Sequence, residues 1–501
     1  MLSLESYRSK VHGCWMGKNI GGTLGAPFEW RRQVNNVEFY TEDLVGDPVP
    51  NDDLDIQMLW LIMLEEKGIN VDSSVMADYW QTCVSPFWVE YGTAKINMQT
   101  GLLPPFTGIR NNDYKHSCGA FIRTEIWACI APGRPHIAVK YAYEDAILDH
   151  GDGEGTYATV FCAAMESAAF IEKDIGTLIE IGLSYIPEDC AVAGAVRLAV
   201  KSYKDGDTWL EARNKILEEF RGSVFLGNMS MISREDIDKG FDKGPMGFDA
   251  PSNIGIIIIG LLYGENNFDR SLCVTVNCGE DTDCTAATLG ALYGIINGIE
   301  SIPQKWIDPI GKKIKIAYLN IGDLGFLGAL LPADLDELTD RTEKLMRKIA
   351  ARQGLPVELP GLEARPPEKN DLYANDKIKS DISTPATRLS FPFYDISLEY
   401  VSGITVKPDE DVKLRLSILS KNRAQAGLNI HCYTPENWDV KPAKTFKSFV
   451  GQRGWEKNST TVELQLSPSG PVGSSNRFVI EITVDGRSAV MLIPVHLLVE
   501  Y

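Results

Sequence analysis

Hydrophobic and polar positions follow one pattern up to about residue 350 and another pattern near the C-terminus. In the first part, apolar residues recur every three or four positions in Ala-rich segments, and loops rich in Gly, Pro, Asn and Asp separate these segments. This spacing is typical of amphipathic helices. The helices predicted in this way cover residues 53–66, 120–130, 156–172, 191–204, 208–221, 252–263, 282–297 and 334–352. We therefore predict an all-α orthogonal helical bundle.

Near the C-terminus the period changes to two. The stretch VKLRLSIL (412–419) places every second apolar side chain on one face, and TVELQL (461–466) repeats this alternation. The stretch RFVIEITVDGRSAVMLIPV predicts a hairpin that turns at Asp485-Gly486. Several such strands predict a β-sandwich.

The composition between the two parts indicates a connecting segment. Residues 353–390 are rich in Pro and in charged residues, which is typical of a linker or of a strap along the surface. We therefore divide the chain into a helical domain (1–352), the linker (353–390) and a β-domain (391–501). The β-domain carries no catalytic constellation, so three roles stay open for it: a carbohydrate-binding module, an oligomer interface or a lid.

Charge and cysteine content limit the partners and the compartment. The chain has 49 Lys and Arg against 68 Asp and Glu, a net charge of −19. Nucleic-acid backbones and anionic membranes repel such a surface, so we expect neither as a partner. The N-terminus lacks the apolar core of a signal peptide, and ten scattered cysteines form no C-x-x-C pair. These features predict a soluble, cytoplasmic protein with reduced thiols.

Two acidic clusters stand out, and each opens a predicted helix. They are NDDLD (Asn51–Asp55) and EDTDC (Glu280–Cys284). Carboxylates this close repel one another, and a helix N-terminus reduces that repulsion, so simple N-caps are one interpretation. The other interpretation is that the clusters converge around hard divalent cations, with Mg²⁺, Mn²⁺ or Ca²⁺ as the candidates by ligand type. A two-metal site would explain the number of acids.

A glycine stripe marks the first helical segment. In HGCWMGKNIGGTLGAPFEW the glycines at 13, 17, 21, 22 and 25 fall near four-residue spacing. Glycine is unfavourable inside a helix, so the stripe indicates a steric demand, either close packing or the approach of a ligand. The segment ends in a loop that contains Glu29.

An ordered set of motifs across about residues 5 to 320 resembles the ADP-ribosylglycohydrolase family. GCWMGKNIGGTLGAPFE is similar to its Gly-rich first helix, NDDLDIQM to its first metal motif and GEDTDCTAATLGALYG to its second. GAFIRTEIW and DHGDGEGTYATVFCAAMESAAF are similar to two further family segments that lie between these motifs. The resemblance implies an all-α fold with a binuclear Mg²⁺ centre, or Mn²⁺ in its place. Family members cleave ADP-ribose from arginine or serine at the anomeric carbon.

The resemblance also implies the metal ligands. These are Asn51, Asp52, Asp53, Asp281, Asp283 and Cys284. Asn51 stands where the family usually has a ligating Thr, and Cys284 stands where Thr or Ser is often a ligand. Cys is a poor ligand for a hard ion, and Asp55 is an additional acid that offers an oxygen in this region.

Catalytic and substrate-binding residues are expected from the same motifs. Glu29 matches the family glutamate beside the metals, and Glu29 or Asp55 is expected to act as general base, with Asp53 beside them. The predicted substrate-binding residues are Gly119, Arg123, His150 and Tyr157. For Arg123 the alternative is an internal ion pair, and for His150 it is a loop residue whose hydrogen bonds are already satisfied.

The function that these features predict is metal-assisted hydrolysis of a glycoside. The substrate is expected to be a small-molecule glycoside or an ADP-ribosylated molecule. One alternative is a hydrolase for a glycoside other than ADP-ribose, such as a glycan fragment or a nucleoside, because the metal motifs are altered and a β-domain is added. A metal-free binding protein that keeps the fold is the other, and an oligomer formed through the β-domain stays open.

Overall fold

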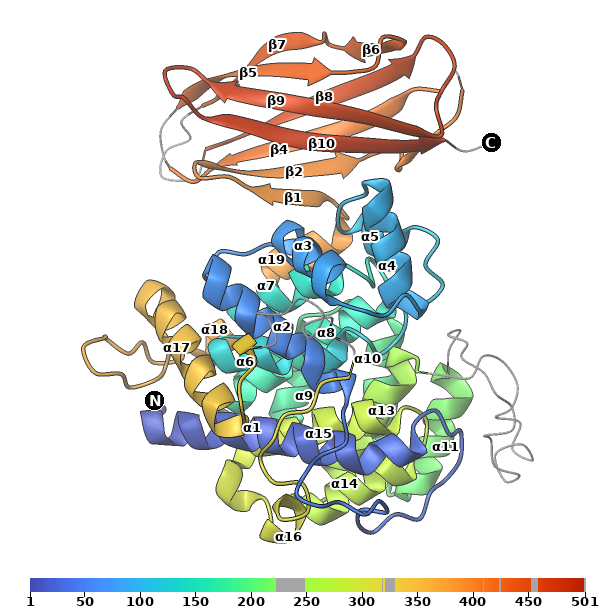
Figure 1. The fold of residues 1–501 in the computed structure, drawn as a ribbon, viewed down its shortest axis with the longest axis vertical. Helices are drawn as coiled ribbons and strands as arrows, with labels where there is room; N and C mark the ends of the chain where they lie inside the picture. The colour runs from blue at the N-terminus through green and yellow to red at the C-terminus, as the bar shows by residue number, and fades with distance from the viewer. Residues whose placement is uncertain are drawn as a thin grey trace.

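The computed structural model describes residues 1–221, 248–317, 319, 329–408, 410–422, 425–451 and 458–499. Figure 1 shows a helical domain and, above it, a domain of two stacked sheets. The predicted combination of an all-α domain with a β-sandwich is confirmed.

The helical domain begins with a long helix and continues to the end of α17. Its helices are α1 (Leu4–Gly25), η1 (Ala26–Phe28), α2 (Asp52–Lys67), α3 (Ser73–Cys83), α4 (Val89–Thr100), α5 (Phe106–Ile109), η2 (Phe121–Arg123), α6 (Glu125–Ile130), α7 (Pro135–Ala146), α8 (Glu154–Ala169), α9 (Ile175–Ser184), α10 (Ala191–Asp205), α11 (Trp209–Phe220), α13 (Ala250–Tyr263), α14 (Phe268–Asn277), α15 (Thr282–Asn297), η4 (Ile299–Ser301), α16 (Gln304–Ile307) and α17 (Leu335–Gln353). None of the helices in the described ranges combines the length and the apolar character that a bilayer crossing requires.

The glycine stripe of α1 lies directly against the backbone of α15. A Cβ atom added at Gly17 would lie 2.0 Å from the carbonyl oxygen of Gly290, and one added at Gly21 would lie 2.1 Å from that of Ala286. No side chain fits at these distances, so the close packing predicted from the stripe is confirmed. The consequence is that α1 fixes the position of α15, which begins at the second acidic cluster.

After α17 the chain runs along the helical domain before it enters the sheets. This segment contains α18 (Lys369–Leu372) and α19 (Asp376–Ser383). It is tied to the helical domain through backbone groups: Arg134 Nη2 donates to the carbonyl of Arg365 at 2.9 Å, and Tyr143 Oη donates to that of Asp381 at 3.0 Å.

The β-domain consists of two five-stranded sheets in the described part of the chain, in the orders β1-β2-β4-β8-β6 and β3-β10-β9-β5-β7. Its strands are β1 (Thr387–Ser390), β2 (Tyr394–Tyr400), β3 (Thr405–Val406), β4 (Val412–Ser420), β5 (Ala426–Tyr433), β6 (Trp438–Lys441), β7 (Thr445–Val450), β8 (Ser459–Pro468), β9 (Ser475–Val484) and β10 (Val490–Val499). Alternate residues of β4, such as Leu414 and Leu416, are buried between the sheets. The hairpin predicted at Asp485-Gly486 is confirmed, because β9 and β10 pair antiparallel on either side of it.

The β-domain contacts the helical domain at the segment from α4 to α5, which lies beneath it in Figure 1. Leu102 forms a small apolar cluster with Ile404 and Leu498 of the β-domain. The rings of Phe106 and Tyr400 meet edge to face, with centroids 4.8 Å apart. The linker and this apolar contact together hold the two domains.

Candidate functional site

The two acidic clusters, which are more than 200 residues apart in the sequence, lie together at the adjacent starts of α2 and α15. Asn51 joins them directly. Its Oδ1 atom accepts a hydrogen bond from the backbone N–H of Asp53 at 2.7 Å, and its Nδ2 atom donates to Asp283 Oδ2 at 3.1 Å. The N-cap of α2 is therefore also a bridge to α15.

The helix α1 packs closely against both acidic clusters. A Cβ added at Gly25 would lie 2.5 Å from the Cα of Asp283, and one added at Gly22 would lie 2.8 Å from Asn51 Nδ2. Glu29 follows directly after α1 and η1, and the next residues pair with the second cluster, because the N–H of Glu280 donates to the carbonyl of Arg31 at 3.1 Å. The glycine stripe therefore determines the geometry of the site as well as the packing.

Oxygen and sulfur atoms from these segments form two groups with a common member. One group is Asp53, Asp283 and Cys284, and the other is Glu29, Asp281 and Asp283. Within each group the ligand atoms lie within 4.8 Å of one another. Asp283 belongs to both groups, so its carboxylate stands between two sets of donors.

Several of these oxygens are buried without a hydrogen-bond partner among the described residues. They are Oδ2 of Asp53, Oδ1 of Asp281 and Oδ1 of Asp283, whereas Oδ1 of Asp53 lies 3.3 Å from the Lys18 ammonium. Burying a charged oxygen without a partner is strongly unfavourable, and hard divalent cations bind carboxylate oxygens. The donor set therefore fits a divalent metal ion.

Burial and mutual repulsion raise the pKa values of these carboxyl groups. Burial raises the pKa of Asp53 to about 7, although the neighbouring Lys18 ammonium opposes this shift. Burial, then the neighbouring Asp283, raises the pKa of Glu29 to about 10. The Asp281 carboxyl also has a raised pKa, first from burial and then from Asp283. A cation in the site would favour the ionised forms.

The two clusters differ in how well helix capping explains them. Asn51 caps α2 with its side chain. Asp281 occupies the N-cap position of α15, but its side chain makes no capping hydrogen bond. An N-cap alone therefore does not account for the Asp281 carboxylate.

Asp55 has a different environment from the other acids. It is buried, its Oδ2 atom accepts a hydrogen bond from the backbone N–H of Ala317 at 2.6 Å, and it belongs to neither group of donors. One of its oxygens therefore ties α2 to the segment before residue 318. Its catalytic role stays a prediction.

Arg123 is fully buried and forms internal ion pairs. Its Nε atom lies 2.9 Å from Asp145 Oδ1, its Nη2 atom lies 2.8 Å from Asp149 Oδ1, and its Nη1 atom donates to the carbonyl of Gly119. The ion-pair alternative for Arg123 is therefore the arrangement in the structure. Its predicted contact with substrate stays a prediction.

His150 is also fully buried, with both ring nitrogens engaged. Nδ1 lies 2.8 Å from Asp149 Oδ1, and Nε2 lies 2.9 Å from Ser117 Oγ. Tyr157 lies one turn into α8 and is partly buried, and burial raises its pKa to about 12. The predicted substrate roles of His150 and Tyr157 stay predictions.

Gly119 lies against Glu90, a residue that the sequence motifs did not indicate. A Cβ added at Gly119 would lie 2.2 Å from Glu90 Oε1, so the Glu90 carboxyl fills the space beside this glycine. Glu90 is buried, its Oε2 atom has no hydrogen-bond partner among the described residues, and burial raises its pKa to about 7. The signal in the sequence was a single acid inside the aromatic stretch PFWVEYG.

Two further buried residues were missed beside the acids. The Lys18 ammonium lies 3.3 Å from Asp53 Oδ1 and 2.8 Å from Glu125 Oε1, so it partly balances the charge of the cluster. Cys118 is buried, and the pKa of its thiol is raised first by burial and then by Asp281 and Asp249. Lys18 lies within the Gly-rich first-helix motif, but the motif is recognised by its glycines and does not mark the lysine.

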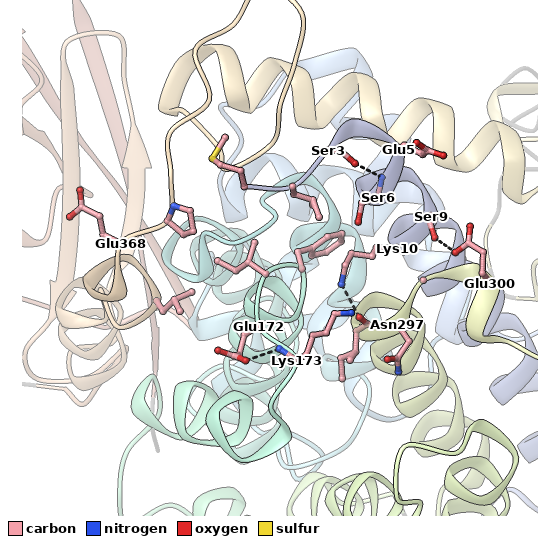
Figure 2. A pocket seen from close by; sticks show the side chains of 18 residues that line it. Ser3, Glu5, Ser6, Ser9, Lys10, Glu172, Lys173, Asn297, Glu300 and Glu368 are labelled. Carbon is pink, nitrogen blue, oxygen red and sulfur yellow. Dashed lines mark hydrogen bonds between the residues drawn. The ribbon is translucent and has the colours of Figure 1, made fainter.

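A cavity of about 660 Å³ lies at the other end of α1 (Figure 2). Its central cation, Lys10, donates to the carbonyls of Ala169 at 3.2 Å and Ile296 at 2.9 Å, which are at the ends of α8 and α15. The Lys10 ammonium therefore caps two helices, and the cavity takes no part in the acidic site.

Comparison with known proteins gives one family and one relative. The family model described as ADP-ribosylglycohydrolase matches residues 3–351. The chain is also similar to the ADP-ribosylarginine hydrolase Tri1 of Serratia proteamaculans (strain 568), with 31% identity over 58 residues. That match covers 12% of this chain and 16% of the relative, so the chain spans about a sixth of the length of the curated relative that it matches. The family predicted from the sequence motifs is confirmed.

Proposed function

The chain belongs to the ADP-ribosylglycohydrolase family, and from this premise we propose that it is a divalent-metal-dependent glycoside hydrolase. It cleaves an ADP-ribosyl bond, or a related bond to a sugar, at the anomeric carbon. The observation that carries the proposal is the pair of donor groups that share Asp283 and contain buried carboxylate oxygens without partners.

The residues that would hold the ions are those of the two donor groups, with Asp52 and Asn51 beside them. When bound, divalent cations supply Lewis acidity and make a coordinated water more acidic. Glu29 acts as general base, because it offers only one carboxylate oxygen to its donor group, which leaves the other to take a proton, and its side chain is not fully buried. Asp55 is less suited to that role, since one of its oxygens already accepts from a backbone N–H.

Other groups orient these acids. Lys18 holds Asp53 through a contact of 3.3 Å, and Asn51 holds Asp283 through a hydrogen bond of 3.1 Å. Both contacts reduce the freedom of a catalytic carboxylate, and positioning of this kind lowers the barrier of the chemical step. Ionised carboxylates in the site also stabilise an oxocarbenium-like transition state.

Two substrate classes follow from different observations. The matched relative is named for ADP-ribosylarginine, which favours an N-glycoside of ADP-ribose on arginine. Arg123 and His150, two of the predicted substrate-binding residues, are fully buried in internal pairs. That observation favours a second candidate, a glycoside without a diphosphate.

The direct test is turnover with two substrate panels, ADP-ribosylated arginine and neutral aryl glycosides. We expect hydrolysis of one panel with Mg²⁺ or Mn²⁺, loss of turnover in EDTA and recovery when the metal is restored. Asp283→Asn should be inactive, whereas Asp78→Asn, at an exposed position on α3, should match the wild type. Turnover that continues at full rate in EDTA would contradict the proposal.

A further inference from the structure

The metal centre contains a thiol on one side only. Cys284 Sγ lies within 4.8 Å of a carboxylate oxygen of Asp53 and of Asp283, whereas the other group, Glu29, Asp281 and Asp283, offers only oxygen. We call the first group the mixed pole and the second the oxygen pole. The two poles share Asp283 but present different chemistry to an ion.

The donors of the mixed pole are buried, and some of their oxygens lack hydrogen-bond partners. Cys284 is 6% exposed and Asp53 is 1% exposed. One oxygen of Asp53 and one oxygen of Asp283 have no hydrogen-bond partner among the described residues, and the other oxygen of Asp53 lies 3.3 Å from the Lys18 ammonium. Unsatisfied buried oxygens point to a bound cation, and the sulfur beside them selects which cation fits best.

Ligand softness then separates the two poles. Thiolate favours Zn²⁺ and other first-row transition metals, whereas carboxylate and water suit Mg²⁺ and Mn²⁺. We propose that the mixed pole binds a transition-metal dication of the Zn²⁺, Fe²⁺ or Co²⁺ class through Cys284 Sγ, while the oxygen pole binds a hard dication. This inference rests on the metal dependence in the proposed function but not on its substrate.

A second thiol in the same region provides a matched control. Cys118 is 1% exposed and Cys284 is 6% exposed, and the pKa of each thiol is raised first by burial and then by the Asp281 carboxylate. Cys118 nevertheless belongs to neither group of donors. A change at Cys118 therefore perturbs the surroundings of the site without removing the proposed ligand.

The experiment is a titration of the metal-free, full-length protein with Co²⁺ alone. In the wild type we expect a sulfur-to-cobalt charge-transfer band in the near ultraviolet, which Zn²⁺ should bleach by displacement. Cys118→Ser should keep the band, and Cys284→Ser should lose it. We also expect the Zn²⁺ affinity of Cys284→Ser to fall at least about tenfold and its Mg²⁺ affinity to change less than about threefold.

The spectroscopic results test the inference independently of whether the protein hydrolyses a glycoside. Cobalt that binds without the band, or a band that persists in Cys284→Ser, would overturn the assignment of Cys284. Cys284→Thr is the second variant if the Ser variant does not fold, because its hydroxyl offers a hard donor at the same place. If the band appears but no glycoside is hydrolysed with any metal, the proposed function fails and this inference stands.

Discussion

Replacing Gly21 by alanine tests whether the packing of α1 on α15 sets the metal centre. The new Cβ would lie 2.1 Å from the carbonyl oxygen of Ala286, 2.3 Å from its carbonyl carbon and 2.5 Å from the nitrogen of Ala287. All three are backbone atoms, so no side-chain rotation relieves the overlap. The two helices must separate instead.

The size of this separation follows from the contact distances. Ordinary contact begins at 3.4 Å, so the 2.1 Å approach requires α1 and α15 to move apart by about 1.3 Å. Overpacking of this kind costs about 3 kcal/mol, near the upper end of its usual range. A loss of that size in a large domain lowers the apparent melting temperature by about 5 °C or more.

The proposed metal site should also bind its ions more weakly. Ala286 lies one turn from Asp283, so the shift of α15 moves the second cluster relative to Asp53. Metal–ligand distances tolerate only about 0.2 Å, and a misplacement of about 1 Å can reduce activity about a hundredfold. We therefore expect weaker Mg²⁺ binding by calorimetry and a lower kcat/KM.

A control glycine separates this effect from glycine replacement in general. Gly176 lies exposed in α9, and a Cβ there would meet only Asp174 Oδ1, at 3.4 Å. Gly176→Ala should be neutral or stabilise the helix by up to about 1 kcal/mol. If Gly21→Ala melts and binds metal like Gly176→Ala, the packing of α1 does not set the site.

Three further predictions concern the shared ligand, protonation and the domain contact. Asp283→Asn should remove metal binding at both poles, measured by calorimetry. Because burial raises the pKa of Asp53 to about 7, the stability that its neutral form contributes is present in acid and lost as pH rises through 7. In EDTA the melting temperature should therefore fall between about pH 5 and pH 8, and the stabilisation that Mg²⁺ provides should grow over the same range. A melting temperature that rises with pH in EDTA would contradict this. Phe106→Ala removes the ring contact with Tyr400 at a cost of about 1 to 3 kcal/mol, and calorimetry should resolve two melting transitions where the wild type shows coupled ones.

Local patterns predicted the framework of the site well. The helix from Thr282 to Asn297 has the predicted bounds, and α2 begins one residue before the predicted start. Periodicity, acidic residues at helix starts and the glycine stripe involve residues that are close together in the sequence, so the sequence alone is enough to identify them. The stripe also predicted a steric demand, although not which helix imposes it.

The environments of individual polar side chains could not be predicted in the same way. Whether Arg123 faces a ligand or an internal carboxylate depends on Asp145 of α7 and on Asp149 of the loop after it, which only tertiary packing brings to Arg123. Glu90 likewise meets Gly119 through the approach of α4 to the segment before η2, with α5 between them in the sequence. Burial and pairing are tertiary properties, and a motif match does not report them.

The contact between the domains extends toward the site through α4 and α5. Arg477 of β9 donates to the carbonyl of Thr100, at the C-terminal end of α4, at 3.2 Å. Asn97 Nδ2 then donates to the carbonyl of Thr107 at 2.8 Å, and Thr107 Oγ1 donates to that of Leu148 at 2.6 Å, two residues before His150.

The helix α4 also carries Glu90 in its first turn, beside Gly119. The β-domain therefore packs beside α4, which carries Glu90, and beside α5, whose Thr107 bonds to the loop that precedes His150. A lid over the acids would contact the starts of α2 and α15, whereas the apolar contact observed here is with Leu102 and Phe106. These contacts place the β-domain against the segment from α4 to α5.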